Sequence, residues 1–244
     1  MTTTTRGLVI REQTIGESDR LVTLLTADYG LVRAFVRGAK QIKNRLASST
    51  SLFAYSDFSL YRGRDAFVVN NASPIEVFFD LRKDILRLAL AQYFAQLAYE
   101  LAEEEQPASE MLSVLLNSLH LLCGGKKDLR IIKCAVEFRL MCLSGYMPDI
   151  LACANCAAYE TDRMFFDTLD GCIYCENCGK PGAIPCPKNV ITAIRFICLT
   201  EPKKIFSFSL SDENMDLLSV ISEKYLLTRV QRKLPTLEFY KALL

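Results

Sequence analysis

Two pairs of cysteines constrain the fold of this chain more than any other feature. Cys153/Cys156 and Cys175/Cys178 each have the pattern C-x2-C, and eighteen residues separate the pairs. Two residues between cysteines let one tight turn present both sulfurs to a single ion, and the longer connection brings the second turn opposite the first. This spacing is typical of a β-ribbon around one tetrahedral zinc. We therefore expect one structural zinc per chain, with these four thiolates as its ligands.

Asn155 and Gly179 support a turn at each pair, because both residue types tolerate left-handed backbone. The second pair has a rival, since Cys172 lies three residues before Cys175 and also forms a C-x2-C. We prefer Cys175/Cys178, because Gly179 follows it and Cys172 is expected in a strand that enters the turn. Cys172 stays open as an alternative ligand to Cys178.

Other roles for the cysteines are less favoured. The chain has 244 residues and ten cysteines without a secretory signal pattern, which indicates a reducing compartment rather than a set of disulfides. A redox C-x-x-C normally opens a helix in a βαβ setting, whereas these pairs lie in turn-rich surroundings. Four thiolates also close the coordination sphere, which disfavours a catalytic zinc. We expect a cytoplasmic protein.

Positive charge is concentrated in one part of the chain. The formal net charge is only +1, but the interval between Asp28 and Asp57 contains no acidic residue and holds a compact group of cations. These cations are Arg33, Arg37, Lys40, Lys43 and Arg45. Such a run is either a solvated face or a surface for phosphates. No uninterrupted apolar run approaches 18 residues, so we expect no membrane-spanning helix.

The first eighty residues are expected to form β-structure. Short segments rich in Val, Leu, Phe and Tyr are separated by turn signals, and they cover residues 8–11, 21–26, 31–37, 57–62 and 66–70. Five short strands of this kind suit a small closed barrel of the OB type. Strand alternation places Arg33, Phe35 and Arg37 on the outer face, as a surface for stacking and phosphate contact. The alternative, that a neighbouring element covers Phe35, stays open.

Beyond residue 80 the apolar period becomes helical. Helices are expected from Leu81 to the acidic run Glu103–Glu105, which we take as a solvated helix end, and then over 109–123, 128–145, 188–199 and 212–229. The fold class is therefore α+β, with an OB-fold β-barrel followed by an all-α domain that carries an inserted four-cysteine zinc ribbon. The predicted domains are 1–80 (barrel), 81–150 (helical), 151–186 (ribbon) and 187–244 (helical).

Motifs for catalysis are not found. The sequence lacks a phosphate-binding G-x-x-x-x-G-K-[ST] loop, a G-x-G-x-x-G turn, a G-x-S-x-G elbow and an H-E-x-x-H helix, and it has a single histidine. A zinc-deaminase signature is missing as well. We therefore expect a protein that is not an enzyme.

An ordered set of short motifs resembles the bacterial RecO family of DNA repair proteins, which are recombination mediators. The resemblance covers nearly the whole chain. In chain order its marks are Gly7-Leu8-Val9-Ile10, the segment 16–22, the segment 30–40, Phe138-Arg139-Leu140, Gly145-Tyr146-Met147-Pro148 and then the cysteine pairs. One departure concerns the step before the second pair, where the family usually has Gly-Gly and this chain has Gly171-Cys172. Zinc is not universal in the family, so the metal prediction depends on this chain's own cysteines.

The resemblance implies a protein that binds single- and double-stranded DNA through its OB domain, anneals complementary strands and helps load RecA onto DNA coated by single-stranded-DNA-binding protein. Similar proteins act with RecR, often alongside RecF, in the bacterial cytoplasm at the nucleoid, and contact the acidic C-terminal tail of the single-strand binder. The predicted DNA-binding residues are Arg33, Phe35, Arg37, Lys40, Lys43, Arg45, Arg62 and Arg64. Arg130, Lys133 and Arg139 are the candidates for the acidic tail.

Two other classes of protein remain open. A zinc-ribbon factor of transcription or of the ribosome would use its ribbon directly on nucleic acid, but the loop between the cysteine pairs holds one cation, Arg163, against several acids. These acids are Glu160, Asp162, Asp167 and Asp170. A purely structural interaction protein would leave the basic run solvated. Salt-dependent binding of a single-stranded oligonucleotide would separate these classes from a mediator.

Overall fold

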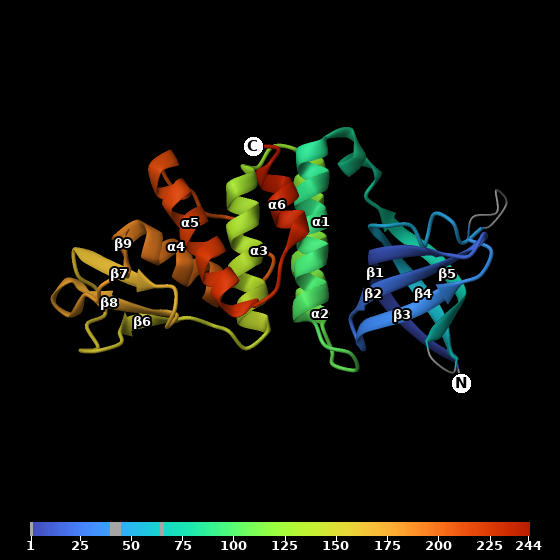
Figure 1. The fold of residues 1–244 in the computed structure, drawn as a ribbon, viewed down its shortest axis with the longest axis horizontal. Helices are drawn as coiled ribbons and strands as arrows, with labels where there is room; N and C mark the ends of the chain where they lie inside the picture. The colour runs from blue at the N-terminus through green and yellow to red at the C-terminus, as the bar shows by residue number, and fades with distance from the viewer. Residues whose placement is uncertain (1, 40–44, 64–65) are drawn as a thin grey trace. The chain divides into compact units, whose positions relative to one another are not determined.

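The computed structural model describes residues 2–39, 45–63 and 66–244, which form two compact units. The first unit comprises residues 1–125 and 234–244, and the second comprises residues 126–233. Figure 1 shows the elements of each unit. The predicted domain boundaries at 80, 150 and 186 separate β-structure from helices along the sequence. The two compact units are instead defined by contacts, and the first unit contains the barrel together with three helices.

A closed five-stranded barrel occupies the N-terminal part. Its strands are β1 (Thr2–Ile15), β2 (Asp19–Thr26), β3 (Gly30–Val36), β4 (Ala54–Arg62) and β5 (Phe67–Val77), in the order β1-β2-β3-β5-β4. Antiparallel pairing of β1 with β4 closes the barrel, and β3 meets β5 in a short parallel contact. This is the strand order of an OB barrel, so the predicted α+β fold with an N-terminal OB domain is confirmed.

Alternation along the strands fills the barrel. On β3 the side chains of Val32, Ala34 and Val36 are buried in the barrel core, as predicted. They pack there with apolar side chains from the other strands, including Val22, Leu24, Phe58, Leu60 and Val69. Burial of this continuous apolar interior is the main force that closes a small barrel.

Four strands are longer than predicted, and the difference is largest for β1 and β5. β1 begins in the run Thr2–Thr5 and continues to Ile15, because pairing with both β2 and β4 supports polar residues that carry no apolar pattern. β5 passes through Pro74, which lies beside the register shift between Tyr55 and Ser56 of β4. A proline fits a sheet at such an irregularity, where its missing N–H leaves no ladder bond unmade.

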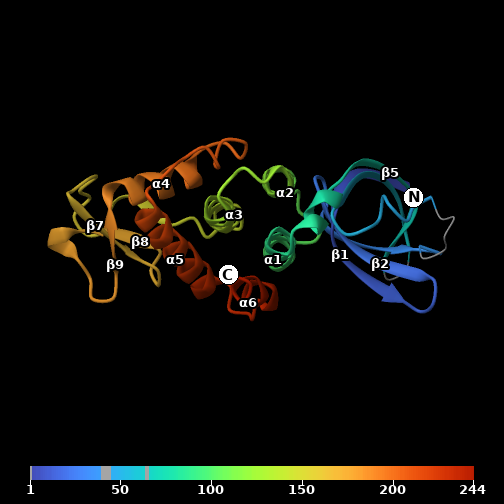
Figure 2. The same ribbon diagram turned by 90° about the horizontal axis from the view of Figure 1, so that it is seen from above.

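Three helices share the first unit with the barrel: α1 (Ile85–Leu101), α2 (Ser109–Gly124) and α6 (Pro235–Lys241). The prediction that the first helix begins at Leu81 is wrong, because η1 (Phe79–Lys83) is a 3-10 turn. Asp84 is the N-cap of α1, and its carboxylate accepts hydrogen bonds from the N–H groups of Leu86 and Arg87. Figures 1 and 2 both show α6 beside α1, where the Thr236 N–H donates to Gln96 Oε1 over 3.2 Å.

The second unit combines three helices with a small sheet. The helices are α3 (Leu129–Leu143), α4 (Lys188–Leu199) and α5 (Asp212–Arg229). The strands are β6 (Asp149–Cys153), β7 (Arg163–Asp167), β8 (Cys172–Cys175) and β9 (Ile184–Pro187), in the order β6-β8-β7-β9, with the short turn η2 (Glu176–Cys178) after β8. Phe138, Phe166 and Tyr225 join α3, the sheet and α5, with ring centroids 5.7–6.3 Å apart.

Among the described helices, none has the length and apolarity to cross a membrane.

Candidate metal centre and nucleic-acid surface

The four predicted zinc ligands meet at one point of the ribbon. Cys153 ends β6 and Cys175 ends β8, while Cys156 and Cys178 follow in the adjoining turns. The first turn is closed by the Ala157 N–H, which donates to the Cys153 carbonyl over 2.9 Å. Its left-handed residue is Ala157 with φ 59° rather than Asn155, and Gly179 has φ −48°. The expectation that Asn155 and Gly179 supply left-handed backbone is therefore wrong, although the turns form.

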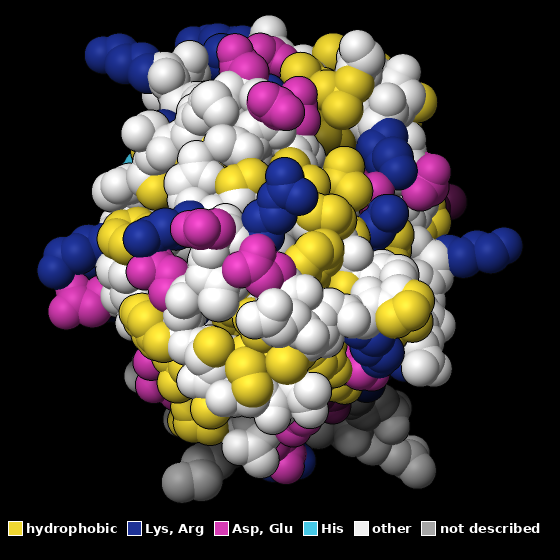
Figure 3. Space-filling view, turned by 90° about the vertical axis from the view of Figure 1, so that its left-hand side faces the viewer, with side chains coloured by type: hydrophobic (Ala, Val, Ile, Leu, Met, Phe, Trp, Pro, Cys, Tyr) yellow, Lys and Arg dark blue, Asp and Glu magenta, His cyan; other side chains and the backbone are white. Residues whose placement is uncertain are grey.

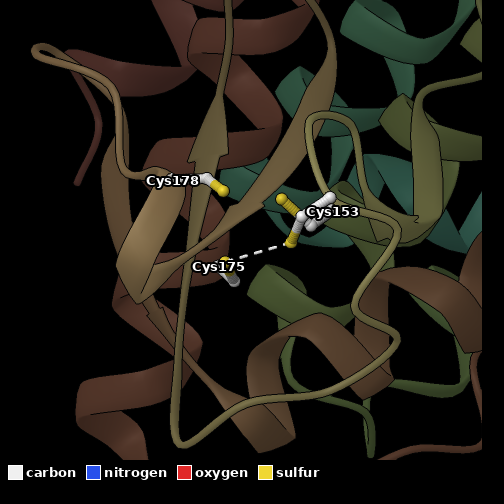
Figure 4. A group of neighbouring side chains, drawn as sticks. Cys153, Cys175 and Cys178 are labelled. Atoms are coloured by element: carbon white, nitrogen blue, oxygen red, sulfur yellow. Dashed lines mark hydrogen bonds between the residues drawn. The ribbon is translucent and has the colours of Figure 1, made fainter.

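The sulfur positions fit a tetrahedral ion. All four Sγ atoms lie within 4.8 Å of one another, and Cys156 Sγ lies 3.6 Å from Cys175 Sγ. A zinc with Zn–S bonds of about 2.3 Å has its sulfurs about 3.8 Å apart, so small shifts bring this cluster to ideal geometry. Figure 4 shows Cys153, Cys175 and Cys178 directed toward a common centre, with a dashed line for the contact between Cys156 and Cys175. The four cysteines can hold one metal ion.

Cys172 does not join this cluster. Successive side chains of a strand point to opposite faces, so Cys172 and Cys175, three positions apart on β8, face opposite sides of the sheet. Cys172 is buried on its own face. The rival pair Cys172/Cys175 therefore cannot converge on one ion while β8 stays extended.

The pKa values of the clustered thiols are shifted in opposite directions. Burial raises the pKa of Cys153, but the backbone N–H groups of Cys156, Cys175 and Asn155 outweigh it and bring the pKa to about 6. Hydrogen bonds with the Cys175 and Cys156 side chains raise the pKa of Cys178 to about 12. Negative charge on one sulfur raises the pKa of the thiols next to it. A bound divalent cation lowers these pKa values, so that all four thiols can bind it as thiolates.

Arg195 of α4 fixes the first cysteine turn, and sequence reasoning missed it. Its side chain is buried, and it donates from Nε to the Ile150 carbonyl over 2.7 Å and from Nη2 to the carbonyls of Leu151 and Tyr159 over 3.0 and 2.9 Å. The signal in the sequence is a single arginine inside the apolar stretch Val190–Cys198. Such an arginine needs buried acceptors, and the ribbon backbone supplies them.

The predicted DNA surface on β3 has the expected orientation. Arg33 of β3 and Arg37, the residue after β3, are exposed, and Phe35 between them is half-buried. Phe35 lies opposite Leu21 of β2 and Val68 of β5, so neighbouring strands cover part of its ring. Alternation along β3 places the exposed part of the ring on the same face as Arg33.

The remaining predicted DNA residues divide into two groups. Arg62, at the end of β4, lies with Arg33 along an open groove of about 440 Å³ that also includes Tyr29 and Phe67. Its guanidinium lies 5.9 Å from the centroid of the Phe67 ring. Arg45 is exposed. Lys40, Lys43 and Arg64 lie outside the described residues.

Acidic side chains share this groove. Arg33 Nη2 lies 3.2 Å from Glu104 Oε1, and Arg62 Nη2 lies 3.6 Å from Glu105 Oε1. Both glutamates belong to the run that we expected to be a solvated helix end. The expectation is incomplete, because the side chains are exposed but the turn is bound to the barrel.

The three α3 cations predicted to meet an acidic tail are engaged within the protein. Arg130 forms ion pairs of 2.7–2.8 Å with three carboxylates, those of Asp128, Asp212 and Asp216. Lys133 is only 3% exposed. Its Nζ lies 2.7 Å from Glu137 Oε1 and 3.0 Å from Glu223 Oε2. Arg139 is half-buried and donates to the Cys198 carbonyl. The structure therefore does not leave the Lys133 ammonium at the surface.

The ribbon does not carry a continuous basic surface among its described side chains. Figure 3 views the protein from the side on which Figure 1 draws β6–β9, and Lys and Arg side chains are interspersed there with Asp, Glu and apolar groups. Lys180 is paired with Asp167 and Asp170, and Lys188 with Glu160. The ribbon therefore presents these lysines beside carboxylates rather than as a run of cations that could follow a phosphate backbone.

Comparison with known proteins identifies the family. A family model described as "Recombination protein O N terminal" matches residues 1–78, and one described as "Recombination protein O C terminal" matches residues 82–238. The DNA repair protein RecO of Acetivibrio thermocellus is 33% identical over 242 residues, which are 98% of this chain and 96% of that protein. RecO of Alkaliphilus metalliredigens is 28% identical over 93% of this chain and 94% of that protein. RecO of Symbiobacterium thermophilum is 29% identical over 97% and 96%. With its OB barrel and four-cysteine ribbon, the chain belongs to the RecO family, whose role is in DNA repair and recombination.

Proposed function

We propose that this protein is a DNA-binding recombination mediator. In this role it anneals complementary strands and helps load RecA onto single-stranded DNA coated by single-stranded-DNA-binding protein, together with RecR and RecF. The observation that carries the proposal is the exposed Arg33 and the partly exposed Phe35 on β3, followed by the exposed Arg37 in the turn after the strand. Cations can neutralise phosphates there while the ring stacks on a base, which is how OB domains hold single strands.

The proposed DNA surface extends from β3 to the end of β4. Arg62 lies along the same groove as Arg33, with Tyr29 and Phe67 as further aromatic groups. Arg45 and the residues outside the described part, Lys40, Lys43 and Arg64, complete the set that we assign to DNA. Binding is expected in the bacterial cytoplasm, at the nucleoid.

For the ribbon we propose a structural zinc held by Cys153, Cys156, Cys175 and Cys178. Four thiolates complete a tetrahedral sphere, so the ion has no position for substrate, and its role is to join the two cysteine turns. Together with the lack of catalytic motifs in the sequence, this leads us to propose that the protein is not an enzyme.

Arg130 and Lys133, two of the α3 residues proposed to meet the acidic tail of the single-strand binder, already contact carboxylates of this protein. The ion pairs of Arg130 with three carboxylates leave that group of charges net negative, and Lys133 is buried. An acidic tail gains little from such a site. Binding of a tail peptide to an Arg130→Ala variant tests the assignment, because loss of binding would support it and unaltered binding would exclude it.

Strand annealing tests the function directly. We expect the purified protein to accelerate pairing of complementary oligonucleotides coated with single-stranded-DNA-binding protein, and to do so without nucleotide hydrolysis. A variant with Arg33→Ala and Arg37→Ala should lose most of the acceleration while keeping its circular dichroism spectrum. A zinc-ribbon factor would instead lose nucleic-acid binding when cations of the ribbon, such as Arg163 and Lys180, are replaced.

A further inference from the structure

The turn between α1 and α2 is attached to the barrel through its backbone. The Leu31 N–H donates to the Glu103 carbonyl over 3.0 Å, and the Glu105 N–H donates to the Tyr29 carbonyl over 3.0 Å. Gly30 at the start of β3 forms a bridge with Glu104. Figure 1 shows this turn next to the turn that joins β2 to β3. The three glutamates 103–105 are therefore held at a defined place on the barrel.

Gly30 shows how closely the turn approaches. A Cβ atom at this position would lie 2.1 Å from the Glu103 carbonyl oxygen and 2.5 Å from that of Gln106, and φ is +59°. Only glycine accepts both the left-handed backbone and the contact with two carbonyl groups. The start of β3 thus fits the acidic turn by its backbone shape.

This attachment places two carboxylates on the arginines that we assign to DNA. Glu104 pairs with Arg33 over 3.2 Å, and Glu105 pairs with Arg62 over 3.6 Å. Both carboxylates line the groove of about 440 Å³ that contains the two arginines. A carboxylate and a phosphate use the same guanidinium donors, so they compete for them.

We propose that Glu104 and Glu105 take the place of DNA phosphates in the free protein, so that a bound strand must displace them. This inference rests on the proposed DNA-binding function and concerns the regulation of the same surface. The four side chains are largely exposed, and exposed ion pairs are weak and screened by salt. A strand with several phosphates therefore displaces the carboxylates, whereas a ligand with a single phosphate gains little. The acidic turn therefore raises the number of phosphates that a ligand must carry in order to bind this surface.

Glutamine variants of the full-length protein test the competition. Affinity for a single-stranded oligothymidine is measured by fluorescence anisotropy at low salt. Glu104→Gln and Glu105→Gln should each tighten binding about two- to fivefold, the range expected when one exposed ion pair no longer has to be broken. Glu103→Gln is the matched control, because it removes the same charge from the same turn and Glu103 forms no ion pair among the described residues. It should change affinity by less than about twofold.

Combining these variants with arginine variants separates competition from a general effect of charge. The gain from Glu104→Gln should vanish in an Arg33→Ala background and persist in an Arg62→Ala background, and Glu105→Gln should show the reverse. Equal gains from all three glutamine variants, or a gain from Glu104→Gln that survives Arg33→Ala, would overturn the inference. The Glu104–Arg33 pair and the Glu105–Arg62 pair are tested independently. If a variant of one pair does not fold, the variants of the other pair still test the inference.

The same measurements distinguish this inference from the proposed function. If Arg33→Ala and Arg62→Ala leave affinity unaltered, DNA does not bind this surface and both proposals fail. If the arginine variants weaken binding but the glutamine variants do not strengthen it, the DNA surface stands and the competition is rejected.

Discussion

The guanidinium of Arg195 lies 4.5 Å from the centroid of the Tyr159 ring and donates to the Tyr159 carbonyl over 2.9 Å. With its bonds to Ile150 and Leu151, this side chain fastens the cysteine ribbon to α4. Arg195→Ala leaves these buried carbonyls without their charged donor, so we expect it to lower the free energy of unfolding by about 3 kcal/mol. Urea denaturation measures the decrease. Arg163→Ala, at an exposed position of the same ribbon, should cost less than about 0.5 kcal/mol.

The cysteine cluster predicts both the metal content and the ligands. Elemental analysis should find one zinc per chain, and X-ray absorption should show sulfur ligands at about 2.3 Å. Cys175→Ser and Cys178→Ser should each lose the metal. Cys172→Ser serves as the control, because Cys172 lies on the other face of β8, and it should keep the metal. Retention of zinc by Cys178→Ser together with its loss from Cys172→Ser would contradict the ligand assignment.

Asp128, the N-cap of α3, predicts a dependence of stability on pH. Hydrogen bonds from the Arg130 side chain, opposed by partial burial, hold the pKa of Asp128 below its ordinary value. A carboxyl group with a lowered pKa in the folded state stabilises the fold at pH values above its unfolded pKa, and this contribution is lost as the pH falls through the folded pKa. Asp128→Asn keeps a capping oxygen but removes the charge. We expect it to lower the free energy of unfolding by about 1 kcal/mol or less at neutral pH.

That difference between Asp128→Asn and the parent protein should shrink once the pH falls below about 4 and vanish in stronger acid. Urea titrations of both proteins across this range provide the measurement. A constant difference at every pH would mean that the ion pair with Arg130 contributes nothing to the stability.

Lys133 lies between two glutamates of the second unit, and its removal should be costly. Lys133→Ala removes the ammonium that lies between the carboxylates of Glu137 and Glu223, and Glu137 is fully buried. Breaking a buried ion pair in this way costs about 3–5 kcal/mol. Lys133→Met combined with Glu137→Gln should restore part of this stability, because it removes buried charge of both signs. A stable Lys133→Ala variant would show that the cluster is more hydrated than the burial of Lys133 indicates.

Local patterns in the sequence were sufficient for much of the fold. Alternation along β3 predicted which side chains face outward, and the helical pattern that begins at residue 128 matches α3, whose N-cap Asp128 accepts from the Arg130 N–H over 2.8 Å. The cysteine spacing predicted the cluster of Cys153, Cys156, Cys175 and Cys178 that can hold a metal ion. Alternation applied to β8 could also have excluded Cys172, since a difference of three positions changes the face of a strand.

Features that depend on distant parts of the chain were missed. α6 is short and is stabilised by contact with α1, and no local signal distinguished it from a loop. The acidic run Glu103–Glu105 has the composition of a solvated helix end, and its attachment depends on Gly30, seventy residues earlier. Likewise, the charge of Lys133 suggested a surface contact, but its burial depends on Glu223 of α5.

The salt dependence of DNA binding tests the central claim most directly. Affinity for a single-stranded oligonucleotide is measured over a range of salt concentrations for the parent protein, for Arg33→Ala/Arg37→Ala/Lys40→Ala and for Phe35→Ala, each with its fold checked by circular dichroism. The triple variant should weaken binding and flatten the slope of log K against log salt by about 0.7 for each phosphate that is no longer neutralised. Phe35→Ala should weaken single-strand binding by about 1–3 kcal/mol with nearly the same slope, and affect duplex much less. An unaltered affinity and slope in the folded triple variant would show that DNA binds elsewhere and that the basic face of β3 is only solvated.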